Sequence, residues 1–216
     1  MKKLTALFMG CIMITGAFAS CGKDEADSSS SSSSKKDNDP LQGKWTMDVE
    51  EMPMNLEFNS GSLSLEMDLS EEAHFSGKNF IVEGSDLGAE NTSFENDKLT
   101  VNMNSTDLLH MTRIEGEGDA LDGTYNELGG MLFDELAKET GDLELKAKID
   151  GEKLIVIYDK LCTYTVSDDT VTLKNPPAAL LGESGKDEAE MKFKIEGDKL
   201  TLTSDDGTED TLTRIK

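Results

Sequence analysis

Two short blocks of sequence recur at a fixed distance, and this recurrence limits the possible folds more than any other feature of the chain. The block Asp-Lys-Leu-Thr begins at Asp97 and again at Asp198, and the block Thr-Arg-Ile begins at Thr112 and again at Thr213. Both displacements are 101 residues (198 minus 97, and 213 minus 112). Two strands and the turn between them have been kept in register, which indicates a duplicated β unit.

The beginnings of the two copies also resemble each other. The motif Leu-x-Gly-x-aromatic begins at Leu41, where it ends in tryptophan, and at Leu121, where it ends in tyrosine. We therefore predict two tandem units, residues 41–116 and residues 121–216. The displacement grows from 80 residues at the first motif (121 minus 41) to 101 at the last, so the second unit holds a net 21 extra residues (101 minus 80).

Alternating apolar and polar residues predict β-strands through both units. The alternating apolar positions include Leu63, Leu65, Met67 and Leu69 in the first unit, and Leu143, Leu145, Ala147 and Ile149 in the second. Pairs such as Asp150-Gly151 and Gly197-Asp198 supply the positive φ that hairpin turns need. Many short strands joined by short turns predict an all-β fold, an antiparallel meander that closes into barrels to remove its edges.

The extra residues of the second unit have two candidate positions. Apolar residues between Met131 and Lys138 are spaced as in a helix, which predicts a short helical insertion near 130–140. A loop that begins at Asn175 and continues through two prolines can hold the remainder. Because departures from a repeat often carry the specific function, the helical insertion is a candidate functional element; its alternative role is to plug one end of a barrel.

The N-terminal residues 1–20 have the layout of a signal peptide, with Lys2 and Lys3 followed by a short apolar run. This run ends in Phe-Ala-Ser-Cys at Cys21, which resembles the lipobox of bacterial lipoproteins. The resemblance implies that Cys21 becomes a diacylglyceryl-modified N-terminus and anchors the protein to the extracytoplasmic face of a bacterial cell membrane. Two acyl chains are sufficient, since each buried CH₂ contributes about 0.8 kcal/mol. The alternative is a soluble secreted protein with a coincidental cysteine.

Residues 21–40 are predicted to be a disordered linker, because the serine tract 28–34 and the charged residues after it have nothing to bury. The linker tethers the folded units to the lipid. Cys162 is then the one thiol in the folded part, and it has no cysteine partner there for a disulfide. Strand alternation places Cys162 beside apolar residues, which favours a buried, inert thiol over a nucleophile.

The Gly-x-Trp motif at Trp45, followed by a meander and an arginine in its last strand, resembles the lipocalin (calycin) pattern, and in particular the short lipocalin-like domains of bacterial lipoproteins. In that superfamily the tryptophan lies across the closed end of the barrel with the arginine over it. The resemblance implies that Trp45 pairs with Arg113 in the first unit and Tyr125 with Arg214 in the second. Such a cation–π contact contributes roughly 0.5–2 kcal/mol. The alternative is one larger barrel closed by Trp45 and Arg214.

Charge and composition exclude several classes of function. With 44 acidic against 21 basic residues, the net charge of −23 repels nucleic acid. The two histidines, His74 and His110, lie in separate predicted strands without ligand spacing, so we predict no metal site and no cofactor. The first unit holds six methionines, and copper(I) coordination by them is conceivable. Four of them, Met47, Met67, Met103 and Met111, occupy alternating strand positions, which favours core packing and also suits adaptable binding of an apolar ligand.

Two hypotheses for the function follow. The first is a non-enzymatic, lipid-anchored protein of the cell surface whose β units bind a small apolar ligand or a protein partner. The second is an extracytoplasmic hydrolase that uses carboxylates, which requires a concave site with at least one carboxyl group of raised pKa. No catalytic motif is present in the sequence, so the first hypothesis is preferred.

Overall fold

The computed structural model describes residues 39–49, 52–140, 144–176, 187–205 and 207–216. The predicted signal peptide, Cys21 and the serine tract lie outside these residues. The strands are β1 (Gly43–Val49), β2 (Met52–Asn59), β3 (Ser62–Asp68), β4 (Ala73–Ser76), β5 (Asn79–Val82), β6 (Ser85–Asp86), β7 (Thr92–Glu95), β8 (Lys98–Met103), β9 (Thr106–Glu115), β10 (Gly123–Gly129), β11 (Leu145–Asp150), β12 (Lys153–Ser167), β13 (Thr170–Lys174), β14 (Glu188–Glu196), β15 (Lys199–Thr203) and β16 (Glu209–Arg214). A short 3-10 helix, η1 (Ala89–Asn91), and the helix α2 (Met131–Thr140) complete the described elements, and neither has the length and apolar content to cross a membrane.

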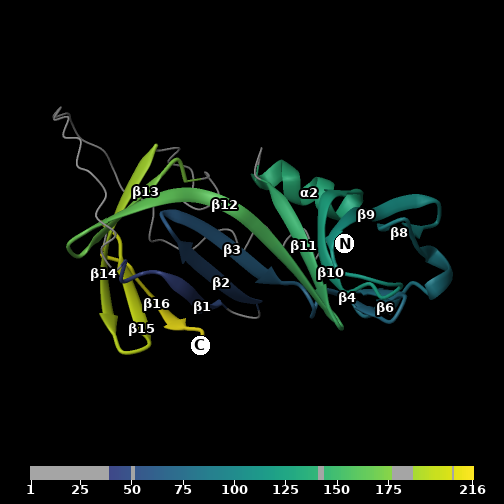
Figure 1. Ribbon diagram of the computed structural model, residues 1–216, viewed down its shortest axis with the longest axis horizontal. Helices are drawn as coiled ribbons and strands as arrows, with labels where there is room; N and C mark the ends of the chain where they lie inside the picture. The colour runs from purple at the N-terminus through teal and green to yellow at the C-terminus, as the bar shows by residue number, and fades with distance from the viewer. Residues whose placement is uncertain (1–38, 50–51, 141–143, 177–186, 206) are drawn as a thin grey trace.

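Eight strands form a closed antiparallel barrel, which confirms the all-β prediction and is compatible with a lipocalin-like architecture. Their order is β13-β14-β15-β16-β1-β2-β3-β12, and β12 pairs back onto β13 to close the circle. The closed barrel occupies one half of the molecule in Figure 1, where β1, β2 and β3 lie beside β12 and β14–β16. In a closed barrel each strand has a hydrogen-bonded neighbour on both sides, so no strand is an edge strand.

The closed barrel combines strands from both predicted units. Strands β1–β3 come from residues 41–116, whereas β12–β16 come from residues 121–216. The remaining strands of the two units also join one another, because β10 of the second unit pairs with β9 of the first. The prediction of two self-contained barrels, one for each unit, is therefore wrong: each unit contributes its first strands to one half of the molecule and its last strands to the other.

Strand β12 connects the two halves because it has different neighbours along its 15 residues. Its first part pairs with β11, with Tyr158 opposite Leu145. Its last part pairs with β13, from Thr163 onward. The register against β3 shifts between Tyr158 and Cys162, where Lys160 has a φ of 52°. This bulge turns the strand out of one half of the molecule and into the closed barrel.

The second half is an open arrangement rather than a closed barrel. The sheet continues from β12 through β11, β10, β9, β8 and β7, and a separate small sheet holds β4, β5 and β6. Helix α2, the predicted insertion near 130–140, packs against β9 and β10 on this half (Figure 1). Its residues Leu132 and Phe133 are buried, so it covers the core of the open half and does not plug the closed barrel.

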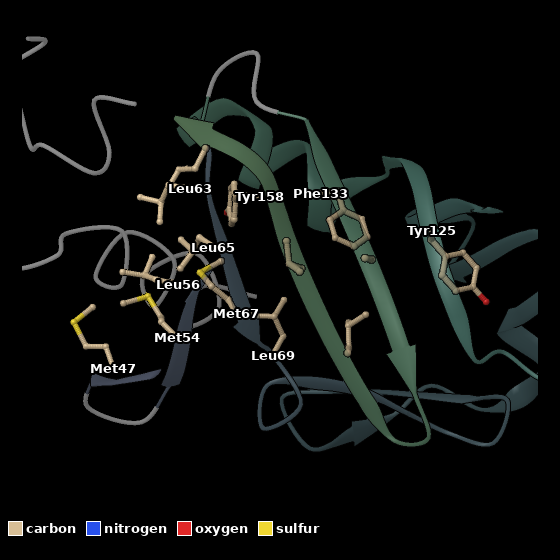
Figure 2. Close-up of a cluster of buried hydrophobic side chains, with 14 of the residues drawn as sticks. Met47, Met54, Leu56, Leu63, Leu65, Met67, Leu69, Tyr125, Phe133 and Tyr158 are labelled. Atoms are coloured by element: carbon tan, nitrogen blue, oxygen red, sulfur yellow. The ribbon is translucent and has the colours of Figure 1, made fainter. Parts of the chain in front are cut away.

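A single apolar core runs through both halves. In β3 every second residue is buried, as the alternation predicted, and the inward residues are Leu63, Leu65 and Met67. Residues opposite one another on neighbouring strands share a face, so β2, β3, β12 and β11 present one continuous inner surface (Figure 2). Burial of this surface is the main stabilising contribution to the fold.

Candidate functional site

One end of the closed barrel is sealed by Trp45 and Arg214. Trp45 is fully buried, and its indole Nε1 donates a hydrogen bond of 2.7 Å to the carbonyl oxygen of Leu41. The Arg214 guanidinium lies 4.0 Å from the centre of the Trp45 ring. The guanidinium also donates hydrogen bonds to the carbonyl oxygens of Gln42 (2.9 Å) and Pro40 (3.2 Å). The arginine therefore ties the segment before β1 to the last strand of the barrel.

The glycine of the Gly-x-Trp motif makes this approach possible. Gly43 has a φ of +122°, a conformation that residues with a side chain rarely adopt. A Cβ atom at Gly43 would lie 3.2 Å from Nη1 of Arg214, closer than most Cβ contacts. The motif is thus explained by two requirements, a backbone turn before the strand and space for the guanidinium.

The open half has the same arrangement with different partners. The Tyr125 hydroxyl donates a hydrogen bond to the carbonyl oxygen of Leu121, four residues earlier, as Trp45 does to Leu41. The Arg113 guanidinium donates hydrogen bonds to the carbonyl oxygens of Ala120 and Gly118, both at 2.9 Å. It also forms an ion pair with Asp97 at 2.6 Å, and its side chain is 6% exposed.

The predicted pairing of Trp45 with Arg113 and of Tyr125 with Arg214 is wrong. In the strand register Trp45 lies opposite Arg214 and Tyr125 lies opposite Arg113. The alternative prediction named the right closing pair, Trp45 with Arg214, although the barrel that this pair closes has eight strands and does not include the whole chain. The reason is the exchange of strands between the units, since each Gly-x-aromatic strand pairs with the Thr-Arg-Ile strand of the other unit.

Sequence reasoning missed Phe94, which takes the stacking role in the open half. The Arg113 guanidinium lies 4.6 Å from the centre of the Phe94 ring. The position equivalent to Phe94 in the second unit is Ile195 (94 plus 101). Each arginine therefore stacks on an aromatic ring. The ring belongs to β1 in the closed barrel and to β7 in the open half.

At the opposite end of the barrel, which we call the far end, three methionines lie in one row. Met47 lies opposite Met54, and Met54 lies opposite Met67, on the neighbouring strands β1, β2 and β3. Their exposed fractions are 7%, 1% and 0%. Figure 2 shows the three side chains on one side of these strands, with Leu56 and Leu65 next to them. Met47 and Met67, which strand alternation placed in the core, are buried as predicted, and Met54 joins them, whereas Met103, which alternation also placed there, is partly exposed.

One carboxylate also faces the inside of the barrel near the far end. Asp210 of β16 alternates with the buried Leu212 and lies opposite the buried Leu202 of β15, so it shares their inward face. The side chain is half-buried, and desolvation raises the pKa of its carboxyl group. No hydrogen bond or ion pair of Asp210 is seen within the part of the chain that the structure describes. A group of this kind is available to a cationic ligand.

Two further polar groups are buried on the inner surface. The Tyr158 side chain is 1% exposed, and its hydroxyl has no hydrogen-bond partner among the described residues. Burial raises the pKa of this hydroxyl, as it raises the pKa of the Cys162 thiol to about 12. Cys162 is 5% exposed and free, so the prediction of a buried thiol is confirmed. A thiol of such high pKa is not a nucleophile at neutral pH.

The two histidines lie apart and have ordinary partners. Nδ1 of His74 is 2.8 Å from the carbonyl oxygen of Ser70, to which it donates. Nδ1 of His110 is 2.6 Å from the carboxylate of Asp107, at an exposed position. Within the described ranges no group of three or more histidine, cysteine, aspartate or glutamate side chains is arranged to hold a metal ion. Comparison with family models, with curated proteins and with solved structures gives no match for this chain.

Proposed function

We propose that this chain is a bacterial lipoprotein of the extracytoplasmic surface, without catalytic activity, whose closed barrel binds a small apolar ligand at its far end. The observations that carry the proposal are the seal formed by Trp45 and Arg214 at one end of the barrel and the row of buried methionines toward the other end. Flexible methionine side chains repack around ligands of different shape, so a filled inner surface is compatible with binding. The lipobox at Cys21 supplies the location.

The duplicated lipocalin-like architecture belongs to the same proposal. Equivalent hydrogen bonds recur at equal spacing, for example from the backbone N–H of Arg113 to the carbonyl oxygen of Asp97 (2.7 Å) and from that of Arg214 to Asp198 (2.8 Å). Both bonds join residues that are 16 positions apart (113 minus 97, and 214 minus 198). Agreement at this level supports duplication of one unit followed by an exchange of strands between the copies.

Membrane anchoring is tested on the mature N-terminus. Mass spectrometry of the protein purified from a bacterial membrane is expected to find Cys21 as the first residue, carrying a diacylglyceryl group. The variant Cys21→Ser is expected to leave the membrane fraction, whereas Cys162→Ser is expected to stay in it. An unmodified Cys21 on a membrane-bound protein contradicts the anchor.

Ligand binding is tested with a neutral fluorescent probe, N-phenyl-1-naphthylamine. We expect saturable binding to the unmodified chain, and weaker binding to Met47→Trp, which adds bulk at the far end. Met103→Trp is the matched control, because Met103 is a partly exposed methionine of β8 in the open half. Equal binding by both variants, or no saturable binding at all, contradicts an apolar ligand in the barrel.

A protein partner is the other binding hypothesis, and one observation favours it. Ile114 and Ile215 are the exposed large hydrophobic residues of the described chain, at 47% and 40%, and they occupy equivalent positions in the two units. Each follows the arginine that closes its half. Replacing both with serine is expected to abolish partner binding without changing probe binding.

A further inference from the structure

A second kind of ligand is suggested by the methionine row itself. Met47, Met54 and Met67 lie opposite one another on three neighbouring strands. Residues directly opposite in an antiparallel pair have Cβ atoms about 4.5–5.5 Å apart, which is within reach of flexible thioether side chains. The sulfur atoms of Met54 and Met67 extend on the same side of the sheet in Figure 2. The three thioethers therefore lie at neighbouring positions on one face of the sheet.

The row is not a requirement of the repeat. Counted from the aromatic residue of the Gly-x-aromatic motif, the positions in the second unit that correspond to Met54 and Met67 are Leu145 and Tyr158. Leucine fills the equivalent core position there without sulfur. The closed barrel therefore has methionine at two positions where the equivalent strands of the open half have other side chains.

A negative charge lies toward the same end of the barrel as the row. Arg214 lies opposite Trp45, so Met47, two residues along β1, and Asp210, four residues back along β16, are both displaced toward the far end. Asp210 faces inward and has no ion-pair partner in the described ranges. A monovalent cation among the thioethers would be offset by this carboxylate, which lowers the cost of holding a charge in an apolar interior.

We propose that Met47, Met54 and Met67 form a binding site for a soft monovalent metal ion, copper(I) or silver(I), with Asp210 as the balancing charge. Thioether sulfur is a soft ligand that favours copper(I) over the hard cations Mg²⁺ and Ca²⁺. The site needs no histidine or cysteine ligand. The inference depends neither on the lipid anchor nor on the apolar ligand proposed above.

The test uses the full mature chain with Cys21→Ser and Cys162→Ala, so that no thiol competes for the metal. Silver(I), which is stable in air, is titrated while the methyl signals of ¹³C-labelled methionine are followed by NMR. We expect saturation at one silver ion per chain, with the signals of Met47, Met54 and Met67 shifting together. Replacing all three with leucine is expected to weaken binding at least 100-fold, and Asp210→Asn about tenfold.

Met111→Leu is the matched control, because Met111 is 1% exposed but lies on β9 in the open half. Silver binding that is unchanged in the triple variant, or equally weakened by Met111→Leu, overturns the site. So does the absence of saturable binding. If the triple variant does not fold, Met54→Leu alone is expected to weaken binding at least tenfold, and unchanged binding overturns the proposal. None of these outcomes affects binding of the naphthylamine probe to the unmodified chain.

Discussion

Removing the Arg214 side chain is expected to weaken the closed barrel in a way that identifies its partner. The variant Arg214→Ala loses the stacking on Trp45 and the hydrogen bonds to the carbonyl oxygens of Gln42 and Pro40. The cation–π contact contributes roughly 0.5–2 kcal/mol, and each net hydrogen bond about 0.5–1.5 kcal/mol. The sum, about 1.5–5 kcal/mol, corresponds to a fall in melting temperature on the order of 5–15 °C for a chain of this size.

Trp45 provides the assay because it is the only tryptophan of the chain. Its fluorescence reports the closed end of the barrel during urea unfolding. We expect Arg214→Ala to shift the emission of native protein and to lower the midpoint of unfolding. Arg214→Lys is the conservative variant: it keeps the charge but loses the planar, forked donor, so we expect an intermediate effect.

A double-mutant cycle decides between the exchanged and the unexchanged pairing. Combining Trp45→Leu with Arg214→Ala is expected to give a coupling free energy of about 0.5–2 kcal/mol. Combining Trp45→Leu with Arg113→Ala is expected to give a value near zero, because Arg113 stacks on Phe94. Coupling to Arg113 and none to Arg214 would refute the strand exchange and restore two self-contained barrels.

Three other changes test the remaining features. Asp210→Asn is expected to raise the free energy of unfolding near pH 7 but not below pH 4. The reason is that Asp210 has a raised pKa in the native barrel, so its ionisation destabilises the native protein as the pH rises through that pKa. Urea unfolding at both pH values measures this difference. Gly123→Ala is expected to cost about 2 kcal/mol or more, since its Cβ would collide with the carbonyl oxygen of Glu115, whereas the Cβ of Gly151→Ala meets no atom within 4 Å and adds only the strain of a positive φ. Cys162, with its pKa raised to about 12, is expected to resist a thiol reagent at pH 8 until urea is added; rapid native labelling would contradict its burial.

Much of the local structure was predictable because its causes lie within a few residues. Alternation along β3 predicted its burial pattern, and the spacing between Met131 and Lys138 predicted the helix that became α2. The Gly-x-aromatic motif predicted a closing residue at Trp45. Phe94 and Asp210 could not be assigned roles in the same way, because an isolated aromatic or acidic residue has no meaning until the opposite strand is known.

The methionine row at the far end shows the same limit of prediction from sequence. Met47 and Met67 were recognisable as inward strand residues and Met54 was not, and the meeting of the three in one row depends on the register of two hairpins. Register is set by turn geometry and by the packing of the whole inner surface, and a slip of one residue would turn each strand over.

The sequence by itself determined the strand-forming pattern and the closing motifs of this protein, since each is encoded in contiguous residues. Only the tertiary structure decided which strands pair. The two units carry the same closing motifs, so the Gly-x-aromatic strand of one fits the Thr-Arg-Ile strand of either, and local sequence cannot distinguish the choices. The bulge in β12 between Tyr158 and Cys162 directs that strand into the barrel that begins with β1, and Trp45 thereby meets Arg214 instead of Arg113.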